Sequence, residues 1–356
     1  MIKQYTHHFL QTAHSLKKEL LIVLVCNVDG LTEDEDNYEG DSITSEYLTL
    51  KQYNKILSAL RQEGYETVSY FDENKFMQDV IEGVIKNENG KKLLVLNSAQ
   101  KGTKIGRKSL IPAFCDLHHI WYNNSNAYVV SLCRDKYISG CILEYLGLPA
   151  PKSWLYKFSE GWLLGQRPPL GEHVIAKLNY ETSSIGLDQE NIFNYNFEQD
   201  DFLEKMSQKY QQDIIVQPFI SGYEVETSFV RSSSEFSFMP MGISLNNHDF
   251  LGDAILDYNA RKDHPYTFFE LDNKIPELVS DIQKCALDVG TALEIKGLGR
   301  VDFRITPQHQ FYITDVATNP GYGDYSSTYN IFQNLGYTYS EMLSILIGIS
   351  IECYIK

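Results

Sequence analysis

Two aspartates in the C-terminal third of the chain are spaced as two paired strands would bring them together. Residues 300–305 and 311–316 are rich in strand-forming residues and are joined by a short turn. The spacing predicts an antiparallel hairpin in which Asp302 faces Asp315, with Arg300 two residues along on the same face. Facing carboxylates repel each other unless a cation lies between them, and Mg²⁺ commonly takes one or two carboxylates together with substrate phosphates. The pair is therefore a candidate magnesium site, and a surface hairpin whose acids face water is the alternative.

The segment after the second strand favours ligand binding over a plain surface hairpin. Pro320, Gly321 and Gly323 stop the strand there. They leave backbone N–H groups that can bind an anion.

Residues 102–109 resemble a Walker A phosphate loop but break its rules. Lys108 stands at the proper distance from Gly102. The residue before it is Arg107, where glycine's freedom is needed for the backbone to wrap a phosphate, and Pro112 falls where the following helix should run. We therefore do not interpret this segment as the phosphate loop of a kinase.

The elements that precede the hairpin begin with an α/β layer. Residues 20–26 form an apolar run that predicts a buried strand, and apolar residues at helical spacing over 47–60 predict a helix that ends near Gly64. A second strand is predicted over 93–96, which gives the order strand, helix, strand. The acidic stretch 32–41 reads as an exposed, solvated loop.

The remainder of the chain is predicted to be α+β, in one or two units. A helix is predicted over 134–146, closed by Gly147 and the prolines that follow it. Later β-branched runs alternate with polar turns and with one more helix, over 276–289. The predicted strands are residues 174–176, 214–216, 225–230, 301–305 and 311–316.

Composition bounds the class of protein. The 356 residues carry 31 Lys and Arg against 47 Asp and Glu, a net charge of −16, and such an acidic surface argues against nucleic acid or anionic lipid as a partner. The apolar run over 342–351 is too short to span a bilayer. Six scattered cysteines form no CxxC pair, which indicates reduced thiols rather than a zinc site or a disulfide framework. We expect a globular protein of the cytoplasm.

Five motifs in order resemble the ATP-grasp superfamily and, within it, the D-alanine:D-alanine ligase branch of carboxylate-amine ligases. The resemblance covers residues from about 93 to the end. The motifs are Asp135-Lys136 with 147–151, 174–177 with 182–186, 214–224, 299–302 and 315–321.

The resemblance implies an ATP-grasp fold, an α/β N-terminal domain plus two α+β lobes. The domains expected are an N-terminal domain over 1–126, a central lobe over 127–216 and a C-terminal lobe with the metal and acceptor site over 217–356. It also implies that ATP and Mg²⁺ are bound.

For ATP, the resemblance implies that Lys136 and Lys177 hold the phosphates and that a turn containing Ser183 and Ser184 folds over them. Ordinary surface lysines and a plain hairpin turn are the alternatives. Three further residues would line the adenine pocket, and a glutamate would bind the ribose. These are Gln217, Phe219, Ile220 and Glu224. The family usually has glutamate where Gln217 stands, and an amide oxygen can still accept from the adenine amino group.

For the reaction, the resemblance implies that Arg300 stabilises developing negative charge while Asp302 and Asp315 hold Mg²⁺. Gly321 and Ser326 match positions that hold the carboxylate of the acceptor. The implied partners are a small-molecule carboxylate and an amino acid, and a homodimer is common among such proteins.

The sequence departs from the family at several points. Ala317 stands where a metal-binding asparagine is usual, which removes a ligand of a second Mg²⁺, and Asn319 or Asp324 are candidate replacements. The family's mobile-loop lysine and tyrosine fall on Arg261 and Lys262, either of which could contact phosphate or substrate. The N-terminal motif whose glutamate binds the donor amine is not recognisable, so the donor is expected to differ.

These features predict an ATP-dependent carboxylate-amine ligase that works through an acyl phosphate, in specialised dipeptide or natural-product synthesis. An authentic cell-wall D-alanine:D-alanine ligase is the nearest alternative. A nucleotide-binding protein that has lost turnover is a second, and a small-molecule kinase on the same fold is a third.

Overall fold

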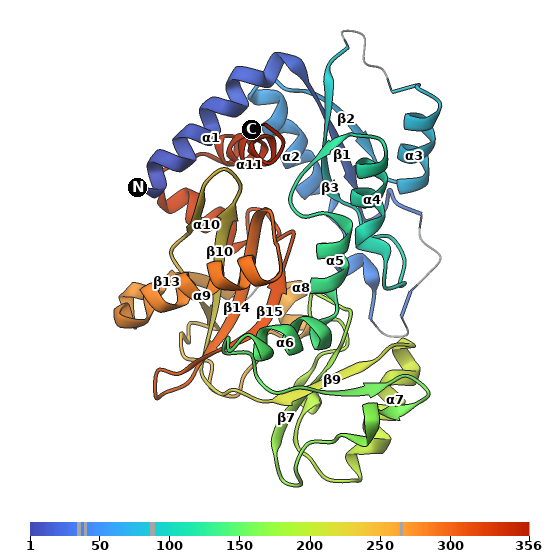
Figure 1. Ribbon diagram of the computed structural model, residues 1–356, viewed down its shortest axis with the longest axis vertical. Coiled ribbons are helices and arrows are strands. Elements are labelled where there is room, and N and C mark those ends of the chain that lie inside the picture. The colour runs from blue at the N-terminus through green and yellow to red at the C-terminus, as the bar shows by residue number, and fades with distance from the viewer. Residues whose placement is uncertain (34–36, 39–40, 86–89, 264–265, 356) are drawn as a thin grey trace.

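The described residues form three β-sheets that follow one another from the N-terminus to the C-terminal lobe (Figure 1). The structure is a computed structural model, and it describes residues 1–33, 37–38, 41–85, 90–263 and 266–355.

The first sheet is parallel and has the strand order β2-β1-β3-β4. Its strands are β1 (Leu20–Cys26), β2 (Glu66–Tyr70), β3 (Lys92–Ser98) and β4 (Trp121–Tyr122). Every residue of β1 is buried, as an apolar strand inside a parallel sheet should be. The predicted strands over 20–26 and 93–96, and the α/β class of this part, are confirmed.

Helices flank this first sheet, and two of them come from opposite ends of the chain (Figure 1). They are α1 (Ile2–Leu16), α2 (Leu50–Gln62), α3 (Glu73–Ile81), α4 (Leu110–Leu117) and α11 (Tyr339–Glu352). α11 packs against α1 so closely that a Cβ on Gly348 would lie 2.0 Å from the Phe9 carbonyl oxygen. None of the described helices combines the length and apolarity that a membrane crossing requires.

The second sheet is antiparallel, in the order β6-β5-β9-β7-β8, and α7 packs against it. Its elements are β5 (Trp154–Lys157), β6 (Gly161–Trp162), β7 (His173–Leu178), β8 (Ile192–Asn194), α7 (Gln199–Tyr210) and β9 (Ile214–Pro218).

The helix predicted over 134–146 is confirmed as α6 (Lys136–Tyr145), and another helix, α5 (Ala127–Arg134), precedes it. Asp135 between them is extended, with φ −80° and ψ 94°, and its side chain accepts from the backbone N–H of Ile138 as an N-cap. The cap places Lys136 at the first position of the second helix.

The third sheet carries the predicted hairpin. Its order is β13-β12-β10-β14-β15, with β11 paired to β10. Its strands are β10 (Tyr223–Arg231), β11 (Glu235–Ser237), β12 (Met241–Leu245), β13 (Tyr266–Glu270), β14 (Gly297–Ile305) and β15 (Phe311–Ala317), and the helices of this part are α8 (Tyr258–Asp263), α9 (Val279–Ala292) and α10 (Ser327–Asn334).

The acidic stretch 32–41 is more than a solvated loop in its described part. The Tyr38 hydroxyl donates to Glu181 at 2.7 Å, and Asp41 accepts from the Tyr210 hydroxyl. Residues 34–36 and 39–40 of the stretch lie outside the described residues. The stretch therefore joins the first sheet to the second.

Candidate functional site

Three carboxylates lie in one row across three neighbouring strands. Asp302 on β14 pairs with Asp315 on β15, as the spacing predicts, and on its other side with Glu226 on β10. Arg300 donates to both oxygens of Asp302, at 2.7 and 2.8 Å, and its third nitrogen lies 3.0 Å from Glu226. The Ser327 hydroxyl donates to Glu226 at 2.5 Å. We call Glu226, Asp302 and Asp315 the acidic row.

The acidic row attracts cations. The pKa of Asp302 is raised, chiefly by burial; Arg300 opposes the rise, and Glu226 and Asp315 add to it. The raised pKa means that the charged form of Asp302 is disfavoured, and a bound cation would counteract this because it favours the charged carboxylate. Among the described residues no group of three or more acid, His or Cys side chains is arranged as a complete metal cage. Two opposed carboxylates without a cage fit Mg²⁺, which completes its shell with water and substrate oxygens.

Two lysines lie beside the acidic row. Lys136 at the start of α6 has its Nζ 3.7 Å from Asp315 and donates to the Glu181 carbonyl oxygen at 2.5 Å. Lys177 on β7 is half-buried. The pKa of Lys177 is lowered to about 8, chiefly by burial; Asp315 and Glu224 oppose this shift, and Lys136 adds to it. An arriving polyphosphate would restore the charge on Lys177.

ATP binding is therefore expected to take up protons near pH 8.5 and to weaken as the pH rises above about 8. In this window the free protein holds Lys177 partly neutral, and the bound anion raises its pKa. Calorimetric titration with Mg²⁺ and a non-hydrolysable ATP analogue, in two buffers of different ionisation enthalpy, measures the uptake. Lys177→Met should bind more weakly and take up fewer protons. Equal uptake by the wild type and this variant would contradict the assignment.

The predicted adenine residues lie around the end of β9. The Gln217 amide N–H donates to the Ser153 hydroxyl at 2.9 Å, so its oxygen is the end available to a ligand. Phe219 meets the ring of His173 edge-on, with 5.5 Å between centroids. Ile220 is half-buried. Glu224 on β10 accepts from Arg304 at 3.1 Å, so a ribose would share this carboxylate with an arginine.

The predicted phosphate turn has an unusual backbone. Ser183 and Ser184 have φ of 55° and 57°, which non-glycine residues seldom adopt. The Ser184 hydroxyl donates to the Leu256 carbonyl at 2.5 Å and so ties the turn to the segment before α8. Arg261 and Lys262 lie on α8, but their side chains are outside what the structure describes.

The segment after β15 turns toward the first sheet. The Asn319 amide oxygen accepts from Asn123 and Asn124, and its nitrogen donates to the Asn97 carbonyl. Asp324 pairs with Lys55 at 2.7 Å. These bonds hold Asn319 against the first sheet and Asp324 against α2. Replacement of the ligand missing at Ala317 by either residue stays a prediction.

The predicted acceptor residues have local roles of their own. The Ser326 side chain caps α10 by accepting from the Tyr329 N–H, and it donates to the Gly323 carbonyl. A Cβ on Gly321 would meet no atom within 4 Å, so the backbone there is open to a ligand.

Sequence reasoning missed a buried charge cluster beside the phosphate turn. Glu46 and Arg107 come from the first sheet's loops, Arg134 from α5 and Glu181 from the segment after β7. Arg107 lies 3.0 Å from Glu46 and 2.8 Å from Glu181, while Arg134 lies 3.3 Å from Glu181. Lys108 completes the cluster. The basic pair Arg107-Lys108 could have indicated this cluster, but the sequence analysis considered the pair only as part of an imperfect Walker A motif.

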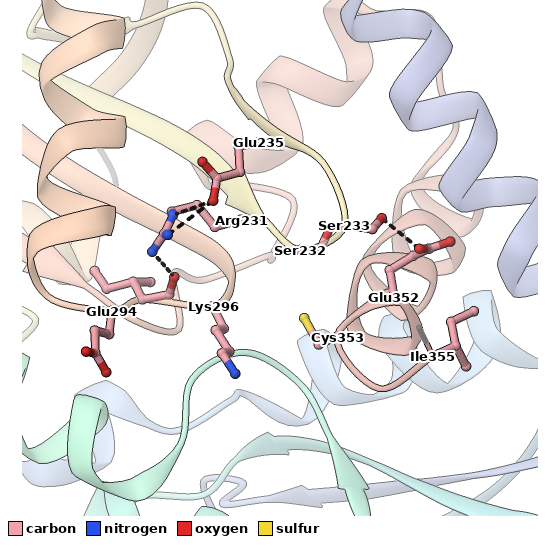
Figure 2. A pocket seen from close by; sticks show the side chains of 10 residues that line it. Arg231, Ser232, Ser233, Glu235, Glu294, Lys296, Glu352, Cys353 and Ile355 are labelled. Atoms are coloured by element: carbon pink, nitrogen blue, oxygen red, sulfur yellow. Dashed lines mark hydrogen bonds and ion pairs between the residues drawn. The ribbon is translucent and has the colours of Figure 1, made fainter.

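A cavity of about 470 Å³ lies away from all of these residues. Figure 2 shows that it is lined from the far end of β10 and from the end of α11, where Arg231 pairs with Glu235 and Ser233 donates to Glu352. Glu226 of the acidic row and Glu224 lie near the other end of β10.

Comparisons with known proteins agree with this arrangement. Residues 167–348 match the family described as "D-ala D-ala ligase C-terminus". The D-alanine–D-alanine ligase of Desulforamulus reducens is 25% identical over 86% of this chain and 94% of its own length, and ligase A of Bacillus cereus is 24% identical over 81% and 92%.

Solved structures share the fold. The D-alanine–D-alanine ligase of Bacillus anthracis, complexed with ATP, aligns with a TM-score of 0.67 at 19% identity over 93% of this chain and 97% of its own. The VanG D-Ala:D-Ser ligase of Enterococcus faecalis aligns with a TM-score of 0.63 at 17% identity, over 93% and 99%. With a family match over half of its length and this fold, the chain belongs to the D-alanine–D-alanine ligase family of ATP-dependent carbon–nitrogen ligases.

Proposed function

We propose that this protein joins D-alanine to a second D-alanine at the expense of ATP. One contact carries the proposal: Lys136, expected to hold phosphate, lies 3.7 Å from Asp315, expected to hold Mg²⁺. The two groups that a metal-bound triphosphate needs therefore meet at one point. The names of the relatives favour this reaction over the specialised ligase that the sequence predicts.

The first step would form an acyl phosphate. A carboxylate oxygen of the donor attacks the γ-phosphorus, the bond from that phosphorus to the β,γ-bridging oxygen breaks, and ADP leaves. Lys136 and Lys177 would neutralise the phosphates, and Arg300 would stabilise the charge that develops on the transferred group. Mg²⁺, held by Asp302 and Asp315, would neutralise the β- and γ-phosphate oxygens.

The second step would form the amide. The acceptor amine attacks the acyl carbon, the bond from that carbon to the phosphate oxygen breaks, and the amine releases a proton as inorganic phosphate leaves. Gly321 and Ser326 would hold the acceptor's carboxylate, which fixes the direction of attack. Alignment and exclusion of water would supply most of the rate, since water would otherwise hydrolyse the acyl phosphate.

Mass spectrometry of a reaction with D-alanine, ATP and Mg²⁺ tests the proposal. We expect ADP and a product of two D-alanines less one water, formed only when D-alanine is present. D-Serine and other amino acids, paired with D-alanine, would test a different acceptor or a specialised ligase. AMP, or a stable phosphorylated amino acid, would contradict ligation through an acyl phosphate. Tight ATP binding without product from any pair would indicate a protein that has lost turnover.

We also retain three expectations as proposals. These are domain boundaries at 126 and 216, a cytoplasmic location and a homodimer.

A further inference from the structure

The basic segment 102–109 lies at the place where a parallel sheet binds its ligands. β1 sits between β2 and β3, so the chain leaves β1 toward one side of the sheet and reaches β3 on the other. Ligands of such sheets bind outside the carboxyl ends of the strands at this reversal. Glu46 belongs to the loop after β1, and Arg107 and Lys108 belong to the loop after β3. The two loops therefore place charge at the expected ligand position.

The same loops contact the phosphate turn of the second sheet. The Lys108 ammonium donates to the Thr182 hydroxyl at 2.8 Å, and that hydroxyl donates to Glu46. Thr182 immediately precedes Ser183 in the turn. Its other neighbour is Glu181, whose carbonyl accepts from Lys136 at 2.5 Å. Lys108 is thus linked through Thr182 and Glu181 to Lys136, which is predicted to hold phosphate.

The cluster carries more positive than negative charge. Among the described residues its cations are Arg107, Lys108 and Arg134, and its carboxylates are Glu46 and Glu181. The Nε groups of both arginines have no hydrogen-bond partner among those residues, although each arginine is more than nine-tenths buried. When Lys108 is protonated, three cations against two carboxylates leave a surplus of one positive charge. A buried surplus of this kind is costly until an anion arrives.

Among the three cations of the cluster, Lys108 is the most exposed to solvent. The side chain of Lys108 is 22% exposed, whereas those of Arg107 and Arg134 are 3% and 4% exposed. Both carboxylates are 1% exposed. A ligand that enters between the first sheet and the phosphate turn would therefore meet the side chain of Lys108 before those of the two arginines.

Glu46 is unsuited to receive an amine. Its oxygens accept from Arg107 at 3.0 Å, from Lys108 at 3.4 Å and from Thr182. A substrate ammonium at this place would face two cations. The charge of the site thus selects a carboxylate over an amine.

We propose that Lys108 binds the carboxylate of the donor and holds it beside the phosphate turn for attack on ATP. This inference rests on the proposed ligase function and adds the residue that receives the donor. Burial and the nearby Arg134 lower the pKa of Lys108 to about 7, and an anion would restore its charge. Arg107 acts through its neighbours as a positioning residue, because it holds Glu46 and Glu181 in place.

The first step can be measured alone. ATP labelled with ¹⁸O in the β,γ-bridge scrambles its label when a donor is phosphorylated reversibly, so the D-alanine concentration that half-saturates this exchange reports donor binding. Lys108→Met is expected to raise that concentration about 10- to 100-fold, the worth of a hydrogen bond to a charged group. The KM for ATP should stay the same. Lys108→Arg should recover part of the loss.

Lys104→Met is the matched control, because Lys104 is exposed on the same segment. It should leave the half-saturating concentration unchanged. The proposal would be overturned if Lys108→Met kept that concentration and only slowed exchange at saturating donor, since the lysine would then act on the transferred phosphate. An unchanged exchange in every respect would overturn it too.

A second readout needs no turnover. Ligand-observed NMR titrates the protein, with Mg²⁺ and a non-hydrolysable ATP analogue, against propionate and propionamide. The wild type and Lys104→Met should prefer propionate, and Lys108→Met should lose much of that preference. If D-alanine gives no exchange but the preference depends on Lys108, the D-alanine ligation fails while this inference stands. A preference that survives in Lys108→Met overturns the inference.

Discussion

The D302N variant is expected to lose at least about 100-fold in kcat, the scale on which one preorganised charge-stabilising group contributes. Asparagine keeps the size of Asp302 and can still accept from Arg300, but it removes the negative charge that faces Asp315. Arg300 would then be neutralised mainly by Glu226, which lies 3.0 Å away. The row would hold Mg²⁺ more weakly.

ADP release with D-alanine and ATP, measured over a range of Mg²⁺ concentrations, checks this prediction. D302N should need more Mg²⁺ for half-maximal rate, and its circular dichroism spectrum should match the wild type. D324N is the control, since Asp324 pairs with Lys55 away from the acidic row. Its rate and Mg²⁺ dependence should stay the same. Wild-type activity in D302N would remove Asp302 from the site.

The R107M variant is expected to lose about 3–5 kcal/mol of stability, the cost of breaking a buried ion pair from one side. Arg107 donates to Glu181 through two nitrogens and to Glu46 through one of them. Methionine fills similar space but leaves both carboxylates short of a cation. Lys108 would still contact Glu46 and Arg134 would still contact Glu181, so part of the stabilisation would remain.

Urea unfolding followed by circular dichroism measures this loss as a lower midpoint. K108M is the informative comparison, because it leaves two arginines against two carboxylates and should cost much less than R107M. Because the cluster joins the first sheet to the second, the unfolding transition that shifts should include the unfolding of both sheets. Equal midpoints for R107M and the wild type would show that the cluster contributes no stability.

Local pattern was sufficient for most of the elements and for the hairpin that carries the acid pair. The apolar run over 20–26 can only be buried, and β1 is buried along its whole length. The register next to the turn pairs Ile305 with Phe311 and, if it continued, would set Asp302 opposite Thr314. A register shift between Asp302 and Phe303 moves the pairing by one residue. Asp302 therefore faces Asp315, as predicted, because of this irregularity and not because of the turn length alone. The helix predicted over 134–146 is α6, whose first residue is Lys136 because Asp135 caps it.

Contacts between distant segments could not be obtained in this way. Glu226 and Asp302 are 76 positions apart, and only the pairing of β10 with β14 sets them side by side. The interpretation of 32–41 as a solvated loop was wrong for Tyr38 and Asp41, because a charged composition does not reveal a partner on another sheet.

The sequence by itself determined the strands, the hairpin of the acid pair and the order of motifs, since each depends on neighbours along the chain. Only the tertiary structure decided which carboxylates the charged side chains of segment 102–109 contact. Arg107 and Lys108 read as a faulty phosphate loop in isolation, yet packing brings them against Glu46 and Glu181 from other segments. A buried charge must find its counter-charge wherever the fold supplies one, and that choice is made in three dimensions.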